Sequence, residues 1–169
     1  MRRTILSALF LVTGLLATEQ HFYLSIEENF TVTLPDSTVL PAWAFQLDDG
    51  APSIPGPVLA VQQGDEIVIH FQNTSSQSQT LHFHGLDVDA SQDGFPGLAN
   101  SVPAGESAIF QFTANHAGSF AYVAMGDGPR SRQMGLYGII KVHLFNLGTE
   151  YDLISQGVDP DWHTAEPEN

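Results

Sequence analysis

Cysteine is absent from the chain of 169 residues. Without a thiol the protein cannot form a disulfide, use a cysteine nucleophile or hold zinc through cysteine. A chain of this length can bury a sizeable hydrophobic core, so disulfides are not required for it to fold. The sequence therefore excludes thiol chemistry and favours one domain held together by packing.

Positive charge is scarce. Lysine and arginine together number 5 against 19 acidic residues, which gives a formal net charge of −14. Such a surface repels phosphate backbones and anionic lipids, so nucleic acid is not an expected partner. The acidity is typical of a solvated surface that keeps an exported protein in solution, and it also attracts cations nonspecifically.

Long hydrophobic runs are missing except at the start of the chain. Arg2 and Arg3 precede an apolar run from Ile5 to Leu16, and small residues end at Ala17. This pattern predicts a secretory signal peptide over residues 1–17, because the run is short for a transmembrane helix. The alternative is an uncleaved anchor. We expect an exported protein, periplasmic or secreted, with no membrane attachment after cleavage.

Helical periodicity is also missing before residue 150. Apolar residues alternate with polar ones in short segments that are separated by glycine, proline and asparagine turns, a pattern typical of a β-sandwich or barrel. Residues 18–146 are predicted to form this all-β domain, and residues 147–169 a polar C-terminal tail. The expected strands are 22–26, 30–34, 39–45, 58–61, 66–72, 81–84, 107–113, 119–125 and 137–144.

Two histidines one residue apart mark the strand that ends at Gly85. Residues i and i+2 of a strand point to the same face, so His82 and His84 would lie side by side with Cβ atoms roughly 6–7 Å apart. Two imidazoles on one face suit ligands of a single metal ion or of adjacent ions. The alternative is an inherited motif that no longer binds metal.

The order of short motifs around these histidines resembles one family. The chain is similar, from about Ala42 to Val142, to the plastocyanin-like (cupredoxin) first domain of multicopper oxidases of the laccase type, which is related to copper nitrite reductases. The resemblance implies a Greek-key cupredoxin β-sandwich and copper as the cofactor. The motifs are Ile54-Pro-Gly-Pro57, Gly64-Asp65, Asn73, Leu81-His-Phe-His-Gly-Leu86, Asp93-Gly94, Val102-Pro-Ala-Gly-Glu106, Ala117-Gly-Ser-Phe120-Ala-Tyr122 and Gly135-Leu-Tyr-Gly138.

The chain departs from the family pattern at the second histidine pair. The family carries a Tyr-His-x-His motif there, whereas this chain has Val123 and Met125 at the histidine positions after Tyr122. A blue type 1 site also needs a thiolate, which the chain lacks. The resemblance therefore implies the fold and a copper ligand pair, without a complete oxygen-reducing cluster in one chain.

The predicted metal ligands are His82 and His84, with Met125 and Met134 as thioether ligands suited to Cu(I). Met125 is expected beside His84 on the neighbouring strand, although it could equally be core filler. His70 is out of phase with the apolar residues of its strand and is predicted to lie on the surface. No catalytic residue is assigned.

Three functions stay open on the sequence alone. The first is a copper-binding module for carriage, buffering or delivery, whose neutral imidazoles bind above about pH 6.5. The second is a subunit of an oligomeric copper oxidoreductase, with the site assembled between chains or served by a redox partner protein. The third is a metal-free interaction domain that presents Phe95 and Pro96 to a partner.

Overall fold

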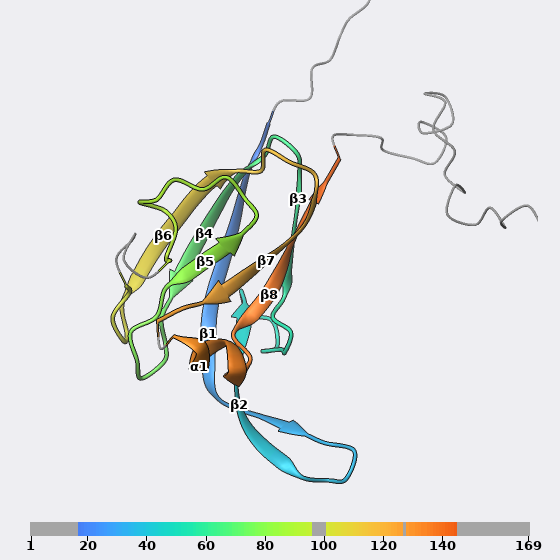
Figure 1. Ribbon diagram of the computed structural model, residues 1–169, viewed down its shortest axis with the longest axis vertical. Coiled ribbons are helices and arrows are strands. Elements are labelled where there is room, and N and C mark those ends of the chain that lie inside the picture. The colour runs from blue at the N-terminus through green and yellow to red at the C-terminus, as the bar shows by residue number, and fades with distance from the viewer. Residues whose placement is uncertain (1–16, 96–100, 127, 145–169) are drawn as a thin grey trace, which may run out of the picture.

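The structure is a computed structural model that describes residues 17–95, 101–126 and 128–144. Nearly all of the expected signal peptide, and all of the expected tail, lie outside these residues. The described chain is built from strands and one short helix (Figure 1). The elements are β1 Glu19–Thr33, β2 Val39–Leu47, β3 Val58–Gln62, β4 Glu66–Gln72, β5 Leu81–His84, β6 Ser107–Thr113, β7 Gly118–Ala124, α1 Pro129–Met134 and β8 Tyr137–His143.

Two four-stranded sheets enclose the core. The first has the order β2-β1-β4-β6 and the second the order β3-β8-β7-β5. Most neighbours are antiparallel, but β1 with β4 and β3 with β8 are parallel. The predicted all-β cupredoxin sandwich is confirmed, and β5, with its two histidines, is an edge strand of the second sheet.

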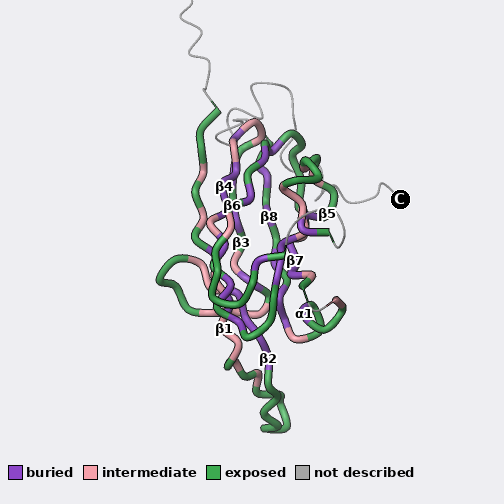
Figure 2. Tube along the Cα trace, turned by 90° about the vertical axis from the view of Figure 1, so that its left-hand side faces the viewer, coloured by how far each residue is buried: buried purple, intermediate pink, exposed green. Residues whose placement is uncertain are grey.

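The core follows from the alternation seen in the sequence. Along β4, Ile67, Ile69 and Phe71 are fully buried, and the opposite sheet supplies Phe83 and Tyr122. Figure 2 shows buried residues alternating with exposed ones along the strands of both layers. Tyr122 is held by a hydrogen bond from its hydroxyl to the Pro57 carbonyl at 2.7 Å. The large aromatic rings thus fix the two sheets against one another.

Two local predictions were wrong. Two separate strands were expected between residues 22 and 34, but β1 is continuous, and a β-bulge between Glu27 and Phe30 absorbs the change of pattern. No helix was expected before residue 150, but α1 covers Pro129–Met134. Its six residues are too few to show helical periodicity. No helix among the described residues is long and apolar enough to cross a membrane.

Candidate metal centre

The two histidines of β5 share one face of the second sheet. Leu81 and Phe83 are buried in the core, while His82 is half-buried and His84 exposed on the other side. The imidazole centroids are 4.4 Å apart and the rings are inclined at 74°. The alternation predicted from the sequence is therefore present, and it places two imidazoles in contact.

Asp93 holds His82 in place. Its Oδ1 lies 2.5 Å from Nδ1 of His82. The side chains are mostly buried, with 14 % of His82 and 15 % of Asp93 exposed. An N–H at Nδ1 donated to this carboxylate leaves Nε2 as the nitrogen with a free lone pair. Phe95 packs its ring edge-on against His82 at 5.3 Å and shields it on another side.

A glycine brings the loop with Asp93 against β5. The Gly94 amide donates to the Leu81 carbonyl at 2.7 Å. A Cβ at Gly94 would lie 1.9 Å from Oγ1 of Thr80 and 2.4 Å from the Leu81 carbonyl oxygen, so no larger residue fits. The loop thereby satisfies part of the free edge of β5 and carries the carboxylate to His82.

The surroundings of His84 lower its pKa and so favour its neutral form. Desolvation by burial lowers its pKa from the ordinary value of 6.5, and the positive charges of His82 and Arg132 lower it further. The carboxylate of Asp93 opposes these effects. Because only a neutral imidazole can donate a lone pair to a metal, a lowered pKa extends metal binding to lower pH.

The strand register places Met125 differently from the prediction. The residue opposite His84 is Ala121, and Val123 lies opposite His82. The Met125 amide donates to the Thr80 carbonyl at 3.1 Å, so the expected position beside His84 was wrong. Gly126 fixes this register, because a Cβ there would lie 2.0 Å from the Ser78 carbonyl oxygen.

Met125 nevertheless belongs to the histidine face. Opposed residues of neighbouring strands point to the same side of a sheet, so Met125, Val123 and His82 share one side. Met134 ends α1 and is partly buried against the hydrophobic core. The structure does not test either methionine as a ligand.

The donor set suits a small metal site. Among the described residues, no three histidine, aspartate and glutamate side chains are arranged to hold one ion. Two imidazoles, with the thioether of Met125 on the same side of the sheet, are soft to borderline donors, which favour copper over magnesium or calcium. The residues fit one copper held by the histidine pair. They do not fit a larger cluster, because the apolar Val123 stands across from His82.

An exposed apolar row continues from the histidines across the sheet. His84 pairs with Ala121, Ala121 pairs with Ile139, and Ile139 pairs with Val58. Val58 is 55 % exposed and Ile139 43 % exposed, and Tyr137 on the same side of β8 is 40 % exposed. The two histidines therefore lie at one end of an exposed apolar strip, here called the β8 strip.

Asp93 is the residue of this site that the sequence prediction missed. The sequence placed it in an Asp-Gly pair and in an acidic loop that lacks an EF-hand calcium pattern, and its carboxylate was not assigned to a histidine. The available signal was the Asp-Gly pair itself. Such a pair after the strand with the two histidines favours a turn, and a turn there can bring a carboxylate back to the strand.

Comparison with known proteins agrees with this geometry. Residues 49–145, more than half of the chain, match the family described as multicopper oxidase. Laccase-2 of Cryptococcus neoformans var. grubii is 33 % identical over 123 residues, covering 68 % of this chain and 20 % of the laccase. The copper-containing nitrite reductase of Alcaligenes xylosoxydans xylosoxydans is 35 % identical over 103 residues, covering 60 % of this chain and 28 % of the reductase.

Solved structures show the same likeness. The multicopper oxidase mgLAC superimposes with a TM-score of 0.67 at 26 % identity, covering 77 % of this chain and 40 % of the oxidase. The copper nitrite reductase of Nitrosomonas europaea gives a TM-score of 0.63 at 28 % identity, over 77 % of this chain and 43 % of the reductase. The chain thus spans less than half the length of these relatives.

Proposed function

Because the chain belongs to the multicopper oxidase family, we propose that it is an exported cupredoxin that binds one copper ion through His82 and His84. Its role would be copper carriage, buffering or delivery. Copper bound there would supply a redox-active, exchangeable cation. The relatives named above are laccases, oxidases and nitrite reductases, and the chain covers only a part of each.

The observation that carries this proposal is the Asp93–His82 contact. A carboxylate on Nδ1 fixes the tautomer and ring orientation of a histidine and makes its Nε2 a better metal donor. A histidine that was merely inherited architecture would need no such partner at 2.5 Å. The lowered pKa of His84, caused first by desolvation, favours the neutral form of the imidazole beside it.

Met125 would act as an assisting ligand. It lies on the same side of the sheet as His82, and it is only partly buried. A thioether added to two imidazoles would favour Cu(I) over Cu(II). Met134 is the weaker candidate, since it packs against the core from the end of α1.

The test is copper affinity under competition with a chromophoric chelator, for both Cu(I) and Cu(II). We expect the His82→Ala/His84→Ala variant to lose one tightly held copper that the wild type binds. The matched control is His116→Ala, since His116 is an exposed histidine that also has a carboxylate partner, Asp87. Equal affinity of wild type and double variant would refute the copper function.

A second candidate is an oligomeric copper oxidoreductase whose site is completed between subunits. The β8 strip favours it, because uncovered apolar surface beside an incomplete metal site suits an interface. Light scattering with and without copper separates the two functions. A monomer in both states would leave the binding module, and a copper-dependent oligomer that also oxidises a substrate would establish the enzyme.

Export has its own test. N-terminal sequencing of the protein secreted by an expressing host should begin at Thr18. A protein that retains residues 1–17 in the membrane fraction would instead establish an anchor.

A further inference from the structure

A second pair of histidines lies on the opposite sheet, away from β5. His21 on β1 and His70 on β4 come from neighbouring parallel strands, offset by two positions. Nδ1 of His21 and Nε2 of His70 are 3.0 Å apart, and the rings stack with centroids 5.3 Å apart. We propose that this pair is a second copper site, a Cu(II) clip formed by Nδ1 of His21 and Nε2 of His70.

The nitrogen separation is the first support. Two nitrogens 3.0 Å apart that each lie about 2.0–2.1 Å from one ion subtend about 95° at that ion. This angle is near the right angle between adjacent ligands of a tetragonal site, which Cu(II) prefers. The separation thus matches that of two adjacent ligands of one ion. Solvent water would fill the remaining positions, since no group of three or more histidine, aspartate and glutamate side chains among the described residues is arranged to hold one ion.

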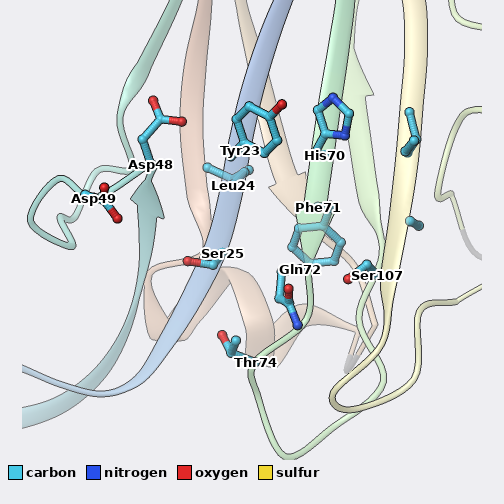
Figure 3. A pocket seen from close by; sticks show the side chains of 12 residues that line it. Tyr23, Leu24, Ser25, Asp48, Asp49, His70, Phe71, Gln72, Thr74 and Ser107 are labelled. Atoms are coloured by element: carbon cyan, nitrogen blue, oxygen red, sulfur yellow. The ribbon is translucent and has the colours of Figure 1, made fainter.

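The surroundings of each ring are the second support. Nε2 of His21 lies 3.5 Å from Oε2 of Glu19, so the proton of a neutral His21 can reside there. Nδ1 of His21 then accepts the Nε2–H of His70, and a metal ion bound by both nitrogens would displace that proton. The ring of Tyr23 stacks on His70 at 4.5 Å, inclined by 11°, and limits its rotation. Figure 3 shows Tyr23 and His70 side by side on their two strands. Both imidazoles are therefore oriented before any metal arrives.

Local charge is the third support. Glu19 and Glu66 are directly opposed in the β1–β4 register, where like charges repel. Asp48 and Asp49 line the groove that also contains Tyr23 and His70. A cation on the histidine pair would lie near Glu19, whose Oε2 is 3.5 Å from Nε2 of His21, and would be attracted to it electrostatically. The described residues that line this groove include no methionine, which separates the site chemically from the β5 site and favours Cu(II) over Cu(I).

The experiment uses the full chain carrying His82→Ala and His84→Ala, so that the β5 site cannot contribute. Cu(II) is titrated against a chromophoric chelator, and the nitrogen hyperfine pattern is recorded by electron paramagnetic resonance. We expect one Cu(II) with two nitrogen ligands. Adding His70→Phe, which keeps a ring for Tyr23 to stack on, should weaken Cu(II) binding by at least about tenfold, the range in which metal sites respond even to indirect changes.

Two further variants complete the design. His116→Ala removes an exposed histidine elsewhere and should leave the affinity unchanged, whereas His21→Ala should match His70→Phe. Circular dichroism checks that each variant is folded. Cu(II) binding that survives His70→Phe, as it would if the chain's own amino terminus bound copper with His21 alone, overturns the proposal. Because the β5 histidines are absent throughout, this result is independent of the function proposed for them.

Discussion

Asp93 and His82 form the closest polar contact of the histidine face, with Oδ1 2.5 Å from Nδ1. The aspartate reaches the strand from a loop eleven positions further along the chain. The same Oδ1 accepts the Phe95 amide at 3.2 Å, so it is held by the loop as well as by the imidazole. This arrangement makes the orientation of His82 depend on a residue outside the proposed ligand pair.

Replacing Asp93 should therefore weaken copper binding without removing a ligand. Asp93→Asn keeps the size of the side chain but removes the charge that favours an N–H on Nδ1. Loss of such a partner typically costs about 10–100-fold in metal affinity. Asp87→Asn is the matched control, because Asp87 pairs with the exposed His116. Affinities that are equal for the two variants would show that Asp93 has no role in binding.

The titration of His84 should occur at lower pH than that of an ordinary histidine. Desolvation, then the charges of His82 and Arg132, lower its pKa below 6.5 in the metal-free protein. Nuclear magnetic resonance of the ring proton would report the midpoint directly. Arg132→Gln should raise that midpoint, since it removes one repulsive charge. A midpoint at or above 6.5 in the wild type would contradict the desolvation argument.

The lowered pKa of His84 should also make the free energy of unfolding depend on pH. Below pH 6.5 the unfolded chain protonates His84 more readily than the folded chain does, so the free energy of unfolding falls as pH decreases. This loss begins at the unfolded pKa and ends at the lower, folded pKa. His84→Gln should flatten the decline in this window. Urea denaturation at several pH values would measure it, with His116→Gln as the control.

Enlarging Gly94 should disturb both stability and copper binding. A Cβ at this position meets the backbone of Leu81, which cannot move aside as a flexible side chain could. Overpacking of this kind typically costs about 1–3 kcal/mol. Gly94→Ala should thus lower the denaturation midpoint and displace Asp93, whereas Asp93→Asn should affect copper alone. A Gly94→Ala protein with unchanged stability would show that the loop relaxes freely.

A histidine at position 123 should strengthen the site. Val123 is opposite His82, on the side where the family pattern carries its second pair. Val123→His would bring a third imidazole to the same face and should tighten copper binding by on the order of tenfold, or about 1.4 kcal/mol. Ser119→His is the control, since Ser119 lies on the same strand but pairs with Lys141. An equal gain in both variants would indicate nonspecific binding.

The sequence predicted the fold well because alternation and turn residues act locally. Strands β4, β5 and β6 begin and end where the pattern placed them. The position of Met125 could not be predicted in this way, because strand register depends on contacts such as that of Gly126 with Ser78, remote in sequence. Helix α1 was missed since six residues carry no periodicity. Asp93 was missed because its contact with His82 depends on the path of the loop that follows β5.

Because β5 is an edge strand, the segment with His82 and His84 is restrained more strongly on one side than on the other. On one side four residues are paired with β7, and on the other, within the described ranges, only the Gly94 amide reaches the strand, at the Leu81 carbonyl. Backbone amides in such a strand open more often than those of the central strands, so they exchange with deuterium early. Copper bound by both His82 and His84 would restrain the end of β5 that has the fewest contacts with neighbouring strands. Slowed deuterium uptake confined to residues 81–95 would then be the signature of an occupied site, readable without any spectroscopic signal from the metal.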